Sequence, residues 1–361
     1  MTASGVPAAG GAPAPARDAV VARVQANCDL ADALHAREKS LCTYLLGMRE
    51  YFRWAARLPL GAAPDRARLS AWIAQREREW DALHEDPDAS YGDLPLADGI
   101  DPFDEDAANR ELRARGLVYG AGLGLFGAPM FFLAERESDQ VRDGVRVIVA
   151  GAELARGFTA APAASRGGTI LVRTDAMRRW LWTRAETARL GSPDTAFSRA
   201  LHAYCSGAVD TVNAVESMVR GETETLVLHE VGELRAATLL GSEWEDMLLA
   251  VKDRRAEVVL RAVRDLLADC LVTLPALTAR AAARSLYFWI ANFDGMRRAL
   301  APELAEACHS DSRDLDLAAL DRAATSGRQV WGNLAVDLLA AWRRGGGEAV
   351  RRETAGLAAG H

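Results

Sequence analysis

Helical periodicity over the second half of the chain is the feature that most narrows the possible folds. From residue 175 to residue 344, apolar residues recur at helical spacing with only short interruptions. Helices with one apolar face, joined by short loops, bury that face by packing against one another. The pattern therefore predicts a helical bundle. Its predicted breaks contain Gly, Ser, Pro or Asp and fall at 191–193, 221, 241–242, 275, 294–295 and 310.

The first half of the chain mixes helical and strand-like patterns. Apolar spacing predicts helices within 18–60 and over 65–84. Apolar and polar residues then alternate at 145–150 and 169–173, as they do in short strands. The expected fold is mainly α, a helical bundle with a small β hairpin or ribbon insertion around residues 145–173.

One stretch of 19 residues, 116–134, carries no charge and approaches the length that spans a membrane. Its glycines and Pro129 disfavour a long helix, and charged sequence flanks both of its ends. We therefore expect a buried, glycine-rich loop with a short helix here, and no membrane span.

Both ends of the chain have the composition of tails. Residues 1–17, rich in Ala, Gly and Pro, are expected to be disordered, and residues 346–361 to be flexible. Between them we expect a single helical domain over 18–345. An alternative division stays open, with an N-terminal helical part, a Gly-rich and β segment, and a C-terminal bundle at 18–115, 116–174 and 175–345.

Charge and cysteine content restrict the class of protein. The formal net charge of -7 and the pI near 5.5 argue against a nucleic-acid partner, which favours a concentrated basic surface. The five cysteines are scattered and form no Cys-x-x-Cys pair, which indicates neither a disulfide framework nor a zinc ribbon. With no signal-peptide pattern at the start, we expect a cytoplasmic protein without a membrane partner. Its partner, a small molecule or another protein, is not specified by any residue pattern.

The run His229-Glu230-Val231-Gly232-Glu233 holds the residues best suited to chemistry. On a helix, His229 and Glu233 lie one turn apart on the same face, and Glu230 points about 100° aside. The His-Glu-x-x-Glu spacing varies the zinc-protease pattern His-Glu-x-x-His, with a carboxylate in place of the second imidazole. Gly232, inside the helix, indicates the close approach of a ligand or of another helix.

Asp265 and Asp269 follow on the next predicted helix, 243–273. Arg261, four residues before Asp265, can pair with it, but Asp269 has apolar neighbours and no basic residue three or four positions away. A buried carboxylate must be paired, protonated or bound to a metal. Asp269 therefore needs a partner from elsewhere in the fold, and the His229 helix is the expected one.

These residues predict a metal site with one histidine and several carboxylates, in which His229, Glu233, Asp265 and Asp269 are the ligands. Such a set suits Mn, Fe or Zn, and its oxygen-rich character favours Mn or Fe. Glu230, beside the ligand face, is the candidate general base of a metal-dependent enzyme. The alternative is a non-catalytic helical binding or scaffold protein, in which the same charges form interhelical networks.

A third pattern, Gly122-x-Gly124-x-x-Gly127, has the spacing of a dinucleotide-binding fingerprint. That fingerprint joins a buried strand to a helix within a βαβ unit. Only residues 117–119 precede the pattern as a strand, and no repeated βαβ pattern follows it. We therefore expect no nucleotide site there.

Three segments, 41–51, 229–233 and 261–269, resemble those of an uncharacterised bacterial family of mostly helical proteins that carries only a locus-tag name. The glycine-rich stretch 119–133 is similar as well. The resemblance covers about residues 25–340. It implies a mostly helical fold, and it implies no activity because none is assigned to the family.

Overall fold

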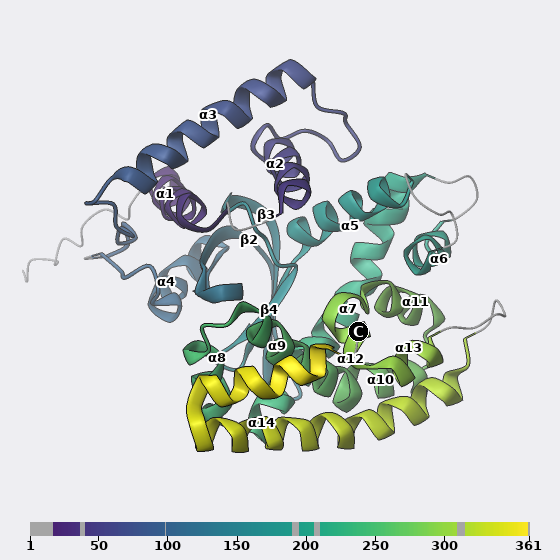
Figure 1. Cartoon of the computed structure of the whole chain (residues 1–361). Coiled ribbons are helices and arrows are strands. Elements are labelled where there is room, and N and C mark those ends of the chain that lie inside the picture. The colour runs from purple at the N-terminus through teal and green to yellow at the C-terminus, as the bar shows by residue number, and fades with distance from the viewer. Residues whose placement is uncertain are drawn as a thin grey trace, which may run out of the picture.

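A computed structural model describes residues 17–36, 40–97, 99–189, 195–205, 210–308 and 315–359. Most of these residues are helical, which confirms the mainly α fold (Figure 1). The strands build one sheet, which is larger than the small hairpin or ribbon that we expected. The predicted N-terminal tail, 1–17, lies outside the described residues except for Arg17, where the first helix begins.

The sheet has five strands in the order β1-β2-β3-β5-β4, and it curls into a half-barrel. Neighbouring strands are antiparallel except for β3 and β5, which are parallel. Shifts of register near Ala134 and Arg136 interrupt the pairing of β2 with β3, and bulges of this kind bend a strand. The five strands are β1 (Leu117–Leu123), β2 (Pro129–Arg142), β3 (Val145–Arg156), β4 (Ala163–Arg166) and β5 (Thr169–Arg173).

The uncharged stretch 116–134 forms β1 and the first part of β2, so our expectation of a loop and a short helix is wrong. The first five residues of β1 are all buried, which removes the alternation that marks a half-exposed strand. Gly120 has no side chain because the ring of Phe132, its partner on β2, occupies that space. A Cβ at Gly120 would lie 2.0 Å from the Phe132 ring.

Four helices accompany the sheet in the N-terminal half of the chain. The apolar face of α1 packs on β2 and β3, and Val20, Val24 and Cys28 share one buried cluster with Tyr119 and Leu133. Figure 1 shows α1, α2 and α3 on one side of the molecule, beyond the sheet. The four helices are α1 (Arg17–His35), α2 (Leu41–Ala55), α3 (Arg66–Glu85) and α4 (Glu105–Leu112).

The C-terminal half is helical, as the periodicity predicts. The long helix α7 packs against α9, and α14 packs against α9 from another side, around a core that includes Trp244, Leu260 and Leu338. The helices are α5 (Thr174–Ala188), α6 (Ala196–Ala203), α7 (Thr211–Leu240), α8 (Ser242–Ala250), α9 (Arg254–Ala268), α10 (Leu274–Ala279), α11 (Ala283–Asn292), α12 (Gly295–Leu300), α13 (Pro302–Ala307) and α14 (Leu317–Ala359).

The predicted helix 243–273 is divided. It ends at Ala250, and α9 begins at Arg254, where the side chain of Asp253 accepts a hydrogen bond from Ala256 N at 2.8 Å. A π-helical turn, η4 (Asp269–Thr273), joins α9 to α10. Turns of this kind often occur at functional sites, and this one carries Asp269.

The chain continues as helix to Ala359, where we expected a flexible tail from 346. Gly345 and Gly346 leave the helical conformation, with φ at +59° for Gly346, and α14 reverses there (yellow in Figure 1). The returning segment buries Val350 and Thr354. Apolar packing after a two-glycine reversal therefore orders a segment whose composition suggests a tail. Among the described residues, no helix has both the length and the apolar character needed to cross a membrane.

Candidate metal centre

Helices α7 and α9 meet at Gly232. A Cβ at this position would lie 2.5 Å from the carbonyl oxygen of Ala268 and 2.9 Å from its carbonyl carbon. Those backbone atoms cannot rotate away, so the contact requires glycine. The close neighbour that a glycine inside a helix indicates is therefore the backbone of α9, and not a ligand.

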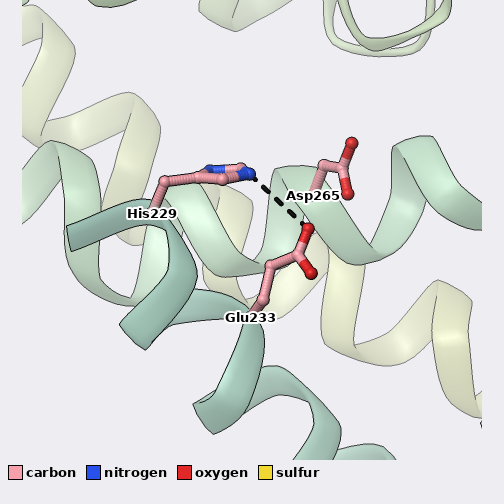
Figure 2. Close-up of side chains that lie close together, drawn as sticks. All are labelled: His229, Glu233 and Asp265. Carbon is pink, nitrogen blue, oxygen red and sulfur yellow. Dashed lines mark ion pairs between the residues drawn. The ribbon is translucent and has the colours of Figure 1, made fainter. Parts of the chain in front are cut away.

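Three side chains gather beside this contact. Figure 2 shows His229 and Glu233, both from α7, beside Asp265, which comes from α9. The Nε2 atom of His229 lies 3.5 Å from Glu233 Oε1, and one donor atom from each of the three residues lies within 4.8 Å of the others. The side chains of His229 and Glu233 keep 22% and 17% of their exposure, so the group is partly exposed to solvent.

Asp269 approaches His229 from the opposite side of the imidazole ring. Its Oδ1 lies 2.8 Å from His229 Nδ1, and its Oδ2 accepts a hydrogen bond from Arg297 Nη1 at 3.3 Å. The carboxylate is fully buried, and it has the distant partner that its apolar sequence context requires. Asp269 is not one of the three donors that lie within 4.8 Å of one another, because it contacts His229 at Nδ1 whereas Glu233 lies near Nε2.

Arginines accompany two of the carboxylates. Arg264 Nη2 lies 3.0 Å from Glu233 Oε2, and Arg264 Nη1 lies 3.4 Å from Glu245. Arg297 comes from α12 and reaches Asp269 across 28 positions of sequence. Sequence reasoning assigned no role to either arginine, because neither lies at a helical spacing from its partner.

The carboxyl groups of Glu233 and Asp265 interact strongly. Burial and the charge of Glu233 raise the pKa of Asp265 to about 6. Burial also acts on Glu233, but the hydrogen bond from His229 and the charge of Arg264 outweigh it and lower the pKa of Glu233 to about 2. Glu233 is therefore the ionised member of the pair, and its charge opposes a second negative charge on Asp265.

The ionisation of His229 and Asp269 follows from their contact. Burial lowers the pKa of the His229 imidazole, but the carboxylates of Asp269 and Glu233 together raise it well above its ordinary value. Burial raises the pKa of Asp269, and the charges of His229 and Arg297 more than reverse this effect, so its pKa is lowered. The pair consists of an imidazolium and a carboxylate at neutral pH.

Glu230, next to His229 on α7, is directed to one side of the three donors and faces Ser165 on β4. Its side chain is buried and hydrogen-bonded to Ser165 on β4, and its Oε2 has no hydrogen-bond partner. Burial, followed by the negative charge of Glu233, raises its pKa to about 7. The helical spacing of 100° per residue places Glu230 beside the donors.

The glycines at 122, 124 and 127 occupy β1 and the turn into β2. A strand follows this turn where the dinucleotide fingerprint needs the N-terminus of a helix. The backbone there contacts α9, because Phe126 N donates to Glu257 Oε1 at 3.0 Å and Arg261 Nη2 donates to Gly124 O at 3.2 Å. The turn thus connects the sheet to the helical half.

The protein is of a mainly helical class with two parts, a curled mixed sheet and a helical bundle. A His-Glu-Asp group lies between two helices of the bundle. The chain belongs to a family of unknown function, DUF6866, whose N-terminal domain matches residues 19–173 and whose C-terminal domain matches residues 178–359. This confirms the resemblance to an uncharacterised family. Neither the curated proteins nor the solved structures contain a match to this chain.

Proposed function

We propose that this protein is a metal-dependent enzyme in which His229, Glu233 and Asp265 bind a divalent metal ion. The observation that carries the proposal is the 3.5 Å between His229 Nε2 and Glu233 Oε1, with a donor of Asp265 within 4.8 Å of both. A metal that bonds its ligands at about 2.0–2.2 Å holds neighbouring donors about 3.0–3.5 Å apart. Small rotations of the Asp265 side chain complete the fit.

Asp269 acts in this proposal as the residue that positions the histidine. Its contact with Nδ1 fixes the plane of the ring and directs Nε2 toward Glu233 and Asp265. A carboxylate on the second nitrogen is the usual partner of a metal-binding histidine, and it raises the basicity of the ligand. This role replaces the direct ligation that the sequence analysis assigned to Asp269.

One nitrogen and two carboxylate donors suit Mn, Fe or Zn, and the majority of oxygen donors favours Mn or Fe. Three protein ligands leave coordination positions for water or substrate, and a bound metal supplies Lewis acidity there. Glu230 is the proposed proton acceptor, because its carboxyl lies beside the donors and its Oε2 has no hydrogen-bond partner.

One observation favours the second candidate, a non-catalytic helical binding or scaffold protein. Arg264 and Arg297 already pair with Glu233 and Asp269, as they would in a purely structural network between helices. Such a network needs no metal. The two candidates therefore differ in whether the purified protein contains one.

Elemental analysis of the purified full chain tests the proposal. We expect Mn, Fe or Zn near one equivalent in the wild type and its loss in His229→Ala. His202→Ala is the matched control, because His202 is an exposed histidine on α6 whose ring is hydrogen-bonded to Ser198 O. Metal content that is unchanged in His229→Ala, or absent from all three proteins, would contradict the proposal and favour the network.

A further inference from the structure

A charged cavity lies in the N-terminal half of the chain, and none of its lining residues belongs to the His229 group. Its volume is about 680 Å³, within the range of sites that hold small molecules. Side chains from α1, α2, α3, the sheet and α5 line it, so it spans the junction between the two family domains. Pockets occur preferentially at such junctions. Four arginines contribute to the lining: Arg17, Arg57, Arg76 and Arg179.

The acids that line this cavity are already neutralised. Glu135 pairs with Arg17 at 2.9 Å, and Asp175 pairs with Arg179 at 3.3 Å. Glu153, whose side chain is fully buried, lies between two further arginines, Arg173 at 2.5 Å and Arg156 at 3.3 Å. No lining carboxylate therefore carries an uncompensated negative charge that would repel an anion.

Among the described residues that line the cavity, one arginine has no ion-pair partner. Arg76 pairs with Asp29 and Glu79, each at 3.2 Å, whereas Arg57 forms no ion pair with any residue in the described part of the chain. Arg57 is exposed at the mouth of the cavity, directly after the end of α2.

The backbone of Arg57 is held in the left-handed region, with φ at +50°. The position after a helix C-terminus often needs this conformation and usually takes glycine, because a side chain there costs roughly 1 kcal/mol. Strained residues of this kind cluster at ligand sites. An arginine in place of glycine therefore indicates a functional role that offsets the cost of the left-handed backbone conformation.

We propose that this cavity binds a small anionic metabolite through a phosphate or carboxylate group, with Arg57 as its principal contact. Arg76 and Arg179 are each paired with two carboxylates, so they supply guanidinium hydrogen-bond donors to the lining and no net positive charge. Trp54 lines the cavity and is stacked on Tyr51 at 5.6 Å, so its indole offers a rigid apolar wall for the rest of the ligand. The volume admits a molecule considerably larger than a simple ion.

Isothermal titration calorimetry of the full chain at low salt tests this site with two probes, pyrophosphate and citrate. We expect saturable binding of at least one probe at one equivalent, weakened about tenfold or more in Arg57→Gly, as the loss of a charge-assisted hydrogen bond implies. Glycine accepts the left-handed conformation, so this variant should melt at or above the wild-type temperature, which separates lost binding from lost folding. Arg352→Ala, which removes an exposed arginine on α14, is the control.

The two probes separate the sources of the anion. Binding of pyrophosphate alone supports a phosphorylated ligand, and binding of citrate alone supports a polycarboxylate. Absence of binding for both probes at millimolar concentration would overturn the proposal. Equal weakening in Arg57→Gly and Arg352→Ala would overturn it too, because it would indicate attraction to the overall charge of the protein and not to this cavity.

Discussion

The two charged centres of this molecule balance their charges differently. Around the N-terminal cavity, arginines match the acids, and Arg57 remains without an ion-pair partner among the described residues. At the junction of α7 and α9, the carboxyl groups of Glu230, Glu233, Asp265 and Asp269 outnumber the arginines that pair with them.

This difference indicates what each centre lacks. Buried charge is tolerated when it is paired, so an unbalanced centre is completed by a ligand of the opposite sign. The cavity is lined by Arg57, which has no ion-pair partner among the described residues, and therefore suits an anion. At the α7–α9 centre, four carboxyl groups face two arginines and the imidazolium of His229, and a divalent cation bound in place of the proton on His229 Nε2 would add the remaining positive charge.

Among the variants that test this comparison, the largest loss of stability is expected at Glu153. Its carboxylate lies between Arg156 and Arg173, both of which are buried. Glu153→Gln removes the charge that these arginines share and should lower the free energy of unfolding by about 3–5 kcal/mol. Urea denaturation measures this loss. Glu243→Gln, which breaks an exposed pair with Arg343, should leave stability unchanged, and equal effects of the two variants would show that the N-terminal network is not a buried one.

A second effect concerns pH. Burial, helped by the nearby charge of Asp29, raises the pKa of Asp32 to about 8. The hydrogen bond from Phe158 N, at 2.7 Å, and the charges of Arg156 and Arg76 lower this pKa but do not outweigh burial. An unfolded aspartate ionises near pH 4, so between pH 4 and 8 the folded state alone holds the proton. Stability should therefore fall as pH rises through this window, by up to about 1.4 kcal/mol per unit, or about 3 kcal/mol from pH 5 to pH 7.

Asp32→Asn keeps an oxygen for Phe158 N but cannot ionise. Its unfolding free energy should consequently vary less with pH than that of the wild type, by the amount that Asp32 contributes. Urea denaturation at pH 5, 6 and 7 measures both proteins. Parallel pH profiles would show that Asp32 is ionised in the folded protein.

A third, smaller effect tests the contact that builds the α7–α9 centre. Gly232→Ala should destabilise the protein by about 1–3 kcal/mol, because the new methyl group meets the Ala268 backbone. It should also weaken metal binding by separating the helices. Gly332→Ala, in the interior of α14 with open space around it, should instead gain about 0.5–1 kcal/mol. If Gly232→Ala had the same free energy of unfolding as the wild type, α7 and α9 could separate without loss of stability.

The sequence predicts the α7–α9 centre better than it predicts the sheet. Asp269 has no basic residue at helical spacing, and this local deficit correctly indicates a distant partner, found in His229 at 2.8 Å. Arg297 carries no such signal, because its contact with Asp269 depends on how α12 packs. Likewise, β1 is buried along most of its length and contains Gly120, so neither alternation nor side-chain composition marks it as a strand.

The cavity cannot be predicted from the sequence either. Its lining comes from helices and strands separated by up to about 160 positions, and no segment of it forms a recognisable motif. The left-handed conformation of Arg57 cannot be inferred either, because glycine is the residue that usually marks such a position. Both features depend on tertiary packing.

The most direct test of the metal proposal is the urea denaturation of wild type and Asp265→Asn, each with and without Mn²⁺. Without metal, Asp265→Asn should be more stable by roughly 1 kcal/mol, because it removes a carboxylate from beside Glu233. With Mn²⁺ at ten times its Kd, the wild type should gain about 1.4 kcal/mol and the variant much less. If Mn²⁺ stabilises both proteins equally, or neither of them, His229, Glu233 and Asp265 do not form a Mn²⁺ site.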